Sequence, residues 1–381
     1  MKDLGNTMSG TWKIPFFGID RQYANIREEI LEATDEVYRT GRVLDGPKTQ
    51  LFEQTIAKMT ERRYAISVNS CTQALIFSLR ALDTIGLDRS INNVLIPAQS
   101  FAATVNSVLE AGFDPVFCDV DPRTGLMDFS KIPVHADEID AIVHVNLFGN
   151  MVDYTKLRVW QEMFSRREIP IIEDAAQSFG GYYKGHPSGN LGDISCLSFD
   201  PTKNLPNYGS GGMILTDHWE LAETCQNLRD NGKQSDHTQS GTNSKMSESD
   251  CAQMLVKLKY FNDWQARRRQ IADYYTEELD GIVYVPEVAD EVEHAWHKYV
   301  IHHDRRNNIK SGLEAEGIET KIHYMPGLHL ETVSFSFNTA DTHQLEGAEE
   351  FSRTCLSLPI YPELLDIEVE QVVETIRQSI Y

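Results

Sequence analysis

Seven short apolar runs between residues 65 and 217 dominate the pattern of hydrophobic and polar positions along the chain. Each run is rich in Val, Ile, Leu or Phe and almost continuously apolar, which is typical of strands covered on both faces. Segments with helical spacing separate several of the runs, for example at residues 71–86 and 155–167. Because strands that alternate with helices form right-handed crossovers, the pattern predicts a mostly parallel α/β sheet. The predicted strands are AISVNS, NVLIPA, DPVFCDVD, DAIVHVNLFG, PIIEDAA, ISCLSFD and GGMILTD.

A polar stretch at residues 229–250 interrupts this pattern. It has almost no residues suited to a core, so we expect a loop that is mobile or becomes ordered on assembly. A single long helix is predicted over roughly residues 248–280, with a buried stripe that contains Leu255, Leu258 and Trp264.

A smaller α/β unit is predicted to follow the long helix. Its expected elements are a strand-like run at HKYVIHH, a helix near residues 308–316, the segments ETKIHYM and LSLPI, and a final helix near residues 367–379. We therefore expect a large domain over residues 1–265 and a small C-terminal domain over residues 266–381. Residues 15–47 predict an extended arm, a helix and a loop that ends in Gly and Pro. The pattern leaves open whether this arm joins the small domain.

The composition supports a sizeable core. Of the 381 residues 41% are hydrophobic and 24% are charged, so intrinsic disorder is not the default. The 35 basic and 57 acidic side chains give a net charge of −22, and there is no stripe of Lys and Arg, so a nucleic-acid partner is excluded. An anionic substrate would need a local basic pocket or helix N-termini to offset this negative field.

The chain has no sequence feature of a membrane or secreted protein. No apolar run approaches the ~20 residues of a membrane helix, and the first residues, MKDLGNTMSGTWK, lack the apolar core of a secretory signal. We therefore expect a cytoplasmic protein with no membrane partner. The cysteines show no Cys-x-x-Cys pair, so we expect them to be reduced and mostly buried, with neither a disulfide framework nor a metal site. They are Cys71, Cys118, Cys196, Cys225, Cys251 and Cys355.

Four segments place polar or aromatic residues directly after an apolar run, where ligands bind in open α/β sheets. In the first, Ser70, Cys71 and Thr72 stand between a strand and a helix. Free N–H groups at a helix N-terminus and the Thr hydroxyl make a phosphate cradle, although an ordinary helix cap explains the same residues. In the second, Phe101 follows a strand and is either part of the core or a flat surface for a stacked ring.

The other two segments carry ionisable side chains. Asp174 ends an apolar strand, where a buried carboxylate needs a cationic side chain or a protonated ligand nitrogen as its partner. Ser198 ends another strand, and Lys203 follows it in a loop bounded by Pro and Gly. A lysine in such a loop is usually solvated, whereas one held in a cleft with a lowered pKa is a Schiff-base nucleophile.

Together the four segments describe one site. A phosphate cradle, an aromatic plate, an aspartate and a lysine are what pyridoxal phosphate (PLP) requires, because the aspartate keeps the ring nitrogen protonated and the lysine exchanges with an incoming amine. The order Thr72, Phe101, Asp174, Ser198 and Lys203, each near a strand end, is more specific than any one of these residues.

The motifs EDAAQSFG, SFDPTKNLPNYGSGG, NSKMSE, KIHYMPGLHL and LSLPIYP resemble the DegT/DnrJ/EryC1/StrS family of PLP-dependent sugar aminotransferases, over nearly the whole chain. The resemblance implies PLP fold type I, with a large domain whose mostly parallel, mixed seven-stranded sheet lies between helices, and a smaller C-terminal α/β domain. It also implies transfer of an amino group from an amino acid, usually glutamate, to a keto group of a nucleotide-linked sugar. A homodimer with shared active sites is expected, because the family places an Asn of the polar loop beside the phosphate of the neighbouring subunit.

By motif position, the resemblance implies Lys203 as the Schiff-base lysine and Asp174 as the partner of the pyridine nitrogen. The other implied cofactor residues are Cys71, Thr72 and Ser198 at the phosphate, Phe101 on the ring face, Gln177 at the ring hydroxyl and, from the neighbouring subunit, Asn243 at the phosphate. The implied sugar-side residues are Tyr208, His323, Tyr324 and His329.

The sequence departs from the family's common pattern at two of these places. Cys71 stands where members usually carry Gly, so a side chain enters the phosphate cradle. Asn146 stands where many members carry a sugar-site His. Both departures bear on the sugar preference more than on the chemistry.

Two other functions are weighed against the aminotransferase. A sugar dehydratase on the same fold carries His at the position of the Schiff-base lysine, so Lys203 disfavours it. A non-enzymatic regulator is disfavoured by the intact set of Lys203, Asp174 and Phe101. The sequence leaves open whether the nucleotide is dTDP, UDP or GDP, and whether the amine goes to C3 or C4.

Overall fold

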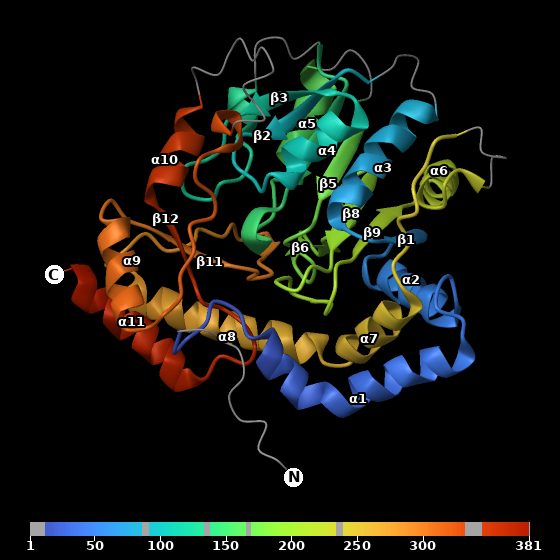
Figure 1. Ribbon diagram of the computed structural model, residues 1–381. Helices are drawn as coiled ribbons and strands as arrows, with labels where there is room; N and C mark the ends of the chain where they lie inside the picture. Colours follow the sequence, from blue (N-terminus) through green and yellow to red (C-terminus); the bar gives the residue numbers. More distant parts are fainter. Residues whose placement is uncertain are drawn as a thin grey trace.

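The structure is a computed structural model that describes residues 12–85, 91–132, 138–164, 169–233, 239–331 and 345–380. Residues 165–167 of a predicted helical run and residues 234–238 of the polar stretch lie outside the described residues. Figure 1 shows a large twisted sheet with helices packed around it and a smaller α/β unit at its side.

The large sheet has seven strands in the order β1-β9-β8-β5-β4-β2-β3, and within the described residues only β9 runs antiparallel to its neighbours. Each predicted apolar run forms one of these strands, so the prediction of a mostly parallel seven-stranded α/β sheet is confirmed. The bounds are β1 Tyr64–Val68, β2 Asn93–Pro97, β3 Asp114–Cys118, β4 Ala141–Val145, β5 Ile171–Asp174, β8 Ile194–Ser198 and β9 Gly212–Thr216. A small second sheet contains β6 Tyr182–Tyr183, β7 His186–Pro187 and β10 Val292–Glu293.

Apolar side chains cover both faces of the large sheet, which explains why the runs are almost continuously apolar. Cys196 and Ile214 lie in one core with residues of α3, α4 and α6, whereas Leu197 and Leu215 lie in another with residues of α1, α2 and α7. The helices are α1 Ile19–Thr40, α2 Pro47–Met59, α3 Cys71–Thr84, α4 Ala103–Ala111, α5 Tyr154–Phe164, α6 Trp219–Arg229, α7 Glu248–Leu258, α8 Phe261–Leu279, α9 Arg306–Ala315, α10 Glu346–Thr354 and α11 Asp366–Ile380.

The single long helix expected over residues 248–280 is wrong, because the chain forms two helices, α7 and α8, with a break at Tyr260. The backbone there opens to φ −102° and ψ −7°, and the Tyr260 ring stacks on Trp264 at 6.0 Å between centroids. The break lets α7 pack over the large sheet while α8 continues into the smaller unit (Figure 1). Of the predicted stripe, Trp264 is buried, whereas Leu255 and Leu258 are half-buried.

The smaller unit has an apolar core of its own, built on the antiparallel pair β11 (Tyr299–His302) and β12 (Cys355–Leu358) and on α8, α9 and α11. Ile14 of the arm is buried in this core and forms a bridge with Ile318, so the arm lies against the smaller unit. Since α8 crosses residue 265 without a break, the division into residues 1–265 and 266–381 stays a prediction.

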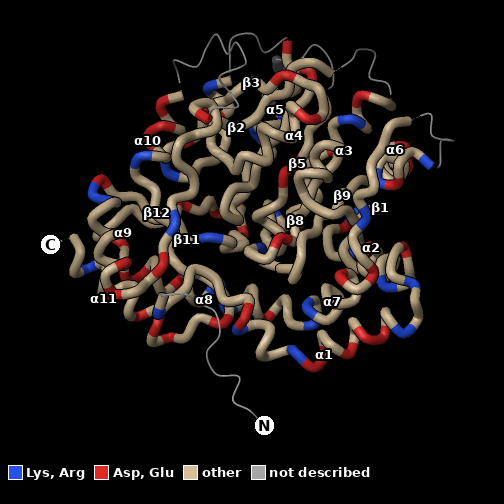
Figure 2. Tube along the Cα trace, in the orientation of Figure 1, with Lys and Arg blue, Asp and Glu red and all other residues tan. Residues whose placement is uncertain are grey.

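The excess of acidic residues is spread over the outer helices, with basic residues among them (Figure 2). None of the described helices is both long and apolar enough to cross a membrane. All six cysteines are buried and free of disulfide bonds. Within the described ranges, no group of three or more His, Cys, Asp or Glu side chains is placed to hold a metal ion.

Gly212, the first residue of β9, allows α3 to begin close to the sheet. A Cβ atom at this position would lie 2.5 Å from the carbonyl carbon of Ser70 and 2.7 Å from the amide nitrogen of Cys71. Both neighbours are backbone atoms that precede or begin α3, and a clash with them cannot be relieved by a side-chain rotation. The absence of a side chain at Gly212 therefore allows the α3 N-terminus to lie this close to β9.

We expect Gly212→Ala to lower the free energy of unfolding by about 1–3 kcal/mol, because the added methyl group overpacks the contact between β9 and α3. Urea unfolding measures the change. Gly209→Ala is the matched control, since a Cβ atom there would come no closer than 3.5 Å to a neighbouring atom. Equal stability of the two variants would contradict the proposed role of Gly212.

Candidate active site

A cavity of about 330 Å³ opens at the carboxyl ends of the parallel strands. Loops that follow β1, β2, β5 and β8 line one side of it, and the arm and the smaller unit line the other. This is the edge at which open α/β sheets bind ligands. The predicted site residues that line the cavity are Cys71, Thr72, Phe101, Asp174, Gln177, Ser198, Lys203, His323 and Tyr324.

Asp174 is the last residue of β5, and its carboxylate is buried. It accepts hydrogen bonds from the amide of Ala176 at 3.1 Å and from the hydroxyl of Thr104 at 3.3 Å. Burial raises the pKa of Asp174 above its ordinary value, and these hydrogen bonds and the charge of Lys203 only partly oppose the rise. No described cation lies within ion-pair distance of Asp174, so the carboxylate has room for a cationic ligand group.

Lys203 lies in a loop that Asp200 organises. The Asp200 carboxylate accepts hydrogen bonds from the amide and the hydroxyl of Thr202, at 3.0 and 2.8 Å, and its carbonyl accepts from the Lys203 amide at 2.9 Å. The Lys203 amine makes no hydrogen bond or ion pair with another described residue. Burial lowers the pKa of Lys203, so the neutral, nucleophilic amine is favoured more than in water.

The N-terminus of α3 presents unpaired backbone donors to the cavity. The Ser70 side chain caps the helix by accepting from the Gln73 amide at 3.2 Å, so the helix-cap interpretation is correct for Ser70. The amides of Cys71 and Thr72 donate to no other described residue and are available to an anion. The Cys71 side chain joins the apolar core below α3, and burial raises the pKa of its thiol well above the ordinary value, so the thiol is neutral.

Phe101 is 55% exposed and lines the cavity, so it is not a core residue. Its ring centroid is 5.8 Å from that of Tyr324. Gln177 is held between two partners: its side-chain oxygen accepts from the Phe148 amide at 2.9 Å, and its nitrogen donates to the Tyr324 hydroxyl at 3.3 Å. These contacts give the cavity a wall of flat and amide side chains.

His323 shares a hydrogen bond of 2.8 Å between its Nδ1 atom and the Ser357 hydroxyl. Burial, together with the positive charges of Lys298, Lys321 and Lys203, lowers the pKa of His323 to about 2. The imidazole is therefore neutral at physiological pH and contributes no positive charge to the cavity.

Three of the predicted site residues lie outside this cavity. Tyr208 packs under the Lys257 amine, which lies 3.3 Å from the centre of its ring. Asn243 is exposed, and its backbone forms an antiparallel β-bridge with Asp230 in the polar loop. His329 is buried beside Phe117, and burial lowers its pKa.

Asn146 is also outside the cavity, and its contacts are structural. Its side-chain nitrogen donates to Glu173 at 2.8 Å, and its oxygen accepts from the Val152 amide at 3.0 Å. Glu173, on the opposite face of β5 from Asp174, also accepts from the amides of Gly189 and Leu191. The buried carboxylate of Glu173 thus accounts for the amide at position 146.

Several cavity residues, from the arm, the smaller unit and the loops of the large sheet, are not evident from the sequence pattern. The basic pocket that an anionic ligand would need is present, because Lys298 and Lys321 join Lys203 in the lining. Lys298 stands within the apolar run HKYVIHH, and a lysine in such a run is a feature that sequence analysis can use. The polar and aromatic residues among those not predicted are Phe16, Phe17, Ser100, Thr104, Asp200, Thr202, Ser210, His297, Lys298 and Lys321.

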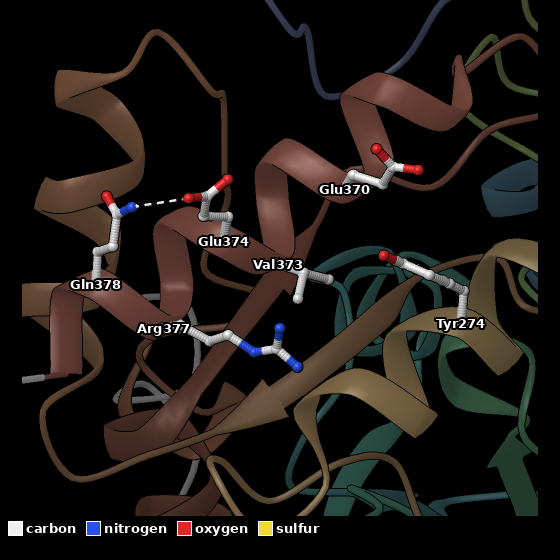
Figure 3. A pocket seen from close by; sticks show the side chains of 6 residues that line it. All are labelled: Tyr274, Glu370, Val373, Glu374, Arg377 and Gln378. Carbon is white, nitrogen blue, oxygen red and sulfur yellow. Dashed lines mark hydrogen bonds between the residues drawn. The ribbon is translucent and has the colours of Figure 1, made fainter.

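A second hollow, of about 690 Å³, lies on the surface of the smaller unit. Figure 3 shows Tyr274 of α8 facing Val373 and charged or amide side chains of α11 across it. Gln378 donates to Glu374, and Arg377 pairs with Glu278, so two of the polar side chains at this surface already have partners. We assign no chemistry to this hollow.

Comparison with known proteins agrees with this geometry. The model of the DegT/DnrJ/EryC1/StrS aminotransferase family matches residues 24–377. The chain belongs to this family. A pleiotropic regulatory protein of Geobacillus stearothermophilus is 34% identical over 96% of this chain and 98% of its own length. A dTDP-3-amino-3,4,6-trideoxy-α-D-glucose transaminase of Streptomyces venezuelae is 32% identical over 97% of this chain and 96% of its own length.

Solved structures of the family confirm the fold of this chain. A DegT/DnrJ/EryC1/StrS aminotransferase from Brucella abortus superposes with a TM-score of 0.89, at 32% identity over 96% of this chain and 99% of that chain. Solved relatives include forms with PLP or its amine form, PMP. The protein is therefore a PLP-dependent aminotransferase, and the resemblance seen in its motifs is confirmed.

The cavity fits this cofactor on observations of its own. The unpaired amides at the start of α3 suit a phosphate, exposed Phe101 suits a ring face, and buried Asp174 lacks the cation that a protonated ring nitrogen supplies. Lys203 provides an amine that is free of other partners.

We expect the cofactor-free Asp174→Asn variant to become progressively more stable than the cofactor-free wild type as pH rises above about 4, the ordinary pKa of an aspartate in an unfolded chain. The folded-state pKa of Asp174 is raised, so the stability it contributes is complete below the unfolded pKa and is lost as pH rises through the folded pKa. PLP should raise the melting temperature of the wild type more than that of the variant. Thermal melts with and without PLP, between pH 4 and 8, measure both effects.

Asp304→Asn, at an exposed carboxylate paired with Arg353, controls for the loss of a surface charge. If PLP stabilises Asp174→Asn as much as the wild type, Asp174 does not pair with the cofactor.

Proposed function

We propose that the protein transfers an amino group from an amino acid, with glutamate as the donor, to the keto group of a nucleotide-linked keto-sugar. The observation that carries this proposal is that Asp174, Lys203, Phe101 and the α3 N-terminus meet in one cavity. Relatives are named as a dTDP-3-amino-3,4,6-trideoxy-α-D-glucose transaminase and a UDP-N-acetyl-3-dehydro-α-D-glucosamine 3-aminotransferase. These names support a nucleotide-linked sugar as the acceptor, but they do not decide which nucleotide it carries.

In this proposal each residue has a defined role. The amides of Cys71 and Thr72, with the Ser198 hydroxyl, would hold the phosphate, and Phe101 would cover the ring. Asp174 would keep the ring nitrogen protonated, and Gln177 would reach the ring hydroxyl. When bound, PLP withdraws electrons from the carbon that carries the amine.

Lys203 would hold the cofactor covalently and then act on protons. Once a donor amine is bound in its place, the Lys203 amine would be free to move a proton at the carbon that carries the donor nitrogen. Its lowered pKa suits this role, because a neutral amine is needed to accept a proton. The predicted sugar-side residues are of two kinds. His323 and Tyr324 line the same cavity and would contact the sugar, whereas Tyr208 and His329 lie outside the cavity and would contact the substrate only if it extended beyond the cavity.

Two alternatives are less well supported. A dehydratase of this family carries His in place of the Schiff-base lysine, and here Lys203 stands in the cavity. A relative is named as a pleiotropic regulatory protein, but a regulator has no need of a buried aspartate and an unpaired lysine in one cavity. The experiment that tests the function is a screen of dTDP-, UDP- and GDP-linked keto-sugars with L-glutamate, followed by cofactor absorbance and product mass.

We further propose a homodimer in which Asn243 completes the site of the neighbouring subunit. Asn243 is exposed and lies outside its own subunit's cavity. The backbone is held on both sides of it, because the Thr242 amide donates to the Leu228 carbonyl and the Ser244 carbonyl accepts from the Asn69 amide. An anchored loop with an exposed amide can donate hydrogen bonds to a phosphate without adding charge.

We expect borohydride reduction of the PLP-loaded protein to attach the pyridoxyl group to Lys203. Peptide mapping by mass spectrometry identifies the modified residue. Lys203→Ala should lose more than about 10³-fold in turnover, because one group serves as nucleophile and proton carrier. Modification of a different lysine would rule out the assigned role.

For the shared site, we expect mixed subunits of Lys203→Ala and Asn243→Ala to regain activity that each variant lacks. One of the two sites in such a heterodimer carries native Lys203 from one subunit and native Asn243 from the other. Turnover after unfolding and refolding of the mixture measures the gain. Lys203→Ala mixed with the double variant Lys203→Ala/Asn243→Ala is the control, since no native pairing is possible there. No gain in the test mixture, or full activity of a monomer in light scattering, would exclude the shared site.

A further inference from the structure

Lys298 is a buried lysine without a hydrogen-bond or ion-pair partner among the described residues, and it has no assigned role in holding the cofactor. It directly precedes β11, and its amide donates to the Phe148 carbonyl at 3.1 Å. Its side chain is only 6% exposed and lines the active-site cavity. The Lys298 amine makes no hydrogen bond or ion pair with a described residue, and it lies 5.1 Å from the centre of the Phe16 ring.

The charged groups around Lys298 are mostly positive. Lys203, Arg268 and Lys321 act on it as cations, and Asp200 is the one nearby carboxylate that acts on it. Each of these groups except Lys203 already has a partner. Arg268 donates to the carbonyls of Trp296 and Ile360, and Lys321 pairs with Glu319 at 2.6 Å. The Asp200 carboxylate accepts a hydrogen bond from the Thr202 hydroxyl.

Burial and the positive charges of Lys203, Arg268 and Lys321 lower the pKa of Lys298 to about 7, and the negative charge of Asp200 opposes this lowering only in part. The two neighbouring imidazoles, of His297 and His323, do not share the role. Burial lowers the pKa of both, so they are neutral and cannot attract an anion. Among the described residues of the lining, the cations are Lys203, Lys298 and Lys321, of which Lys203 would be occupied by the cofactor and Lys321 is paired.

We propose that Lys298 binds an anionic oxygen group of the substrate, namely the carboxylate bonded to the reacting carbon of the amino-acid donor. The inference rests on the proposed aminotransferase function. The reacting carbon must come to the Lys203 amine, and the carboxylate is one bond away from that carbon. Lys298 is close enough to Lys203 for their charges to interact, and it offers a donor that is already desolvated.

The diphosphate of a nucleotide-linked sugar carries the same kind of oxygen anion. It is separated from the reacting carbon by part of the sugar ring, so the donor carboxylate is the group favoured by the proximity of Lys298 and Lys203. The experiment has to distinguish these two sources of negative charge.

The test uses three variants of the PLP-loaded protein. Lys298→Met keeps the length of the side chain and removes the charge, and Lys298→Arg keeps a charge that does not titrate. Lys310→Met is the matched control, because Lys310 lies on α9 and pairs with Glu314. Cofactor absorbance after mixing with L-glutamate in a single turnover gives the apparent dissociation constant of the donor. Calorimetry with dTDP and UDP gives the affinity for a diphosphate.

We expect Lys298→Met to weaken glutamate binding by about 10–100-fold, as for a lost hydrogen bond to a charged group, while Lys298→Arg and Lys310→Met stay near the wild type. The affinity for dTDP and UDP should not change. Between pH 6 and 8, the wild type should lose affinity for glutamate above about pH 7, and Lys298→Arg should lose less, because only the lysine gives up its proton there. Lys203, Arg268, Lys321, Asp200, His297 and His323 are common to both proteins and do not account for a difference between them.

Three results would overturn the proposal. Unchanged glutamate binding in Lys298→Met excludes the donor carboxylate. A loss of dTDP or UDP affinity alone assigns Lys298 to the diphosphate instead. Equal losses in Lys298→Met and Lys298→Arg, with lowered melting temperatures, indicate a packing role. If the cofactor absorbance of the wild type does not change with glutamate, the proposed function itself is wrong. If the absorbance of the wild type and of Lys298→Met changes equally, only the role of Lys298 is wrong.

Discussion

Burial of ionisable groups at the edge of an apolar sheet is the constraint on which the site depends. Asp174, Lys203 and Lys298 line one cavity, and none of them forms an ion pair with a described residue. Burial raises the pKa of the aspartate and lowers the pKa of both lysines, which means that each charged form is less stable there than in water. Such an arrangement costs folding free energy, and ligands of opposite charge recover it when they bind. The same groups that weaken the free protein therefore give the cavity its affinity.

The large sheet brings these groups together, and short local contacts then orient them. Asp174 and Ser198 end the adjacent parallel strands β5 and β8, so both residues reach the same edge of the sheet, with Asp174 opposite Cys196 in the register. The loop after β8 depends on the Asp200 side chain, which holds Thr202 and so sets the direction of the chain at Lys203. Gly212 admits the start of α3 to the same edge. These orienting contacts are hydrogen bonds or close backbone approaches, and they form without the cofactor.

The sequence predicted the sheet well because both of its faces are buried, which leaves an apolar run at every strand. It predicted Asp174, Ser198 and Lys203 together because each follows such a run. It failed where tertiary packing decides: the apolar stripe continues through Tyr260, so the break between α7 and α8 is not visible in the pattern. Phe16 and Lys298 were missed for a related reason. They reach the cavity through the packing of the arm and the smaller unit, which local periodicity does not encode.

One cavity must accept two different substrates in turn, and this limits how a fixed charge can be used. On the proposed assignment, Lys298 contacts a carboxylate when the donor is bound. A keto-sugar without a carboxylate on its ring offers no such group beside the reacting carbon. A lysine with an ordinary pKa would then remain as a buried, unpaired cation and would oppose binding of the acceptor. With a pKa of about 7, Lys298 can release its proton at little cost at physiological pH and become a neutral amine. On the proposed assignment, the positive surroundings that lower this pKa would serve both halves of the reaction, because they would attract an anionic donor and would let Lys298 lose its charge when a neutral group takes the donor's place.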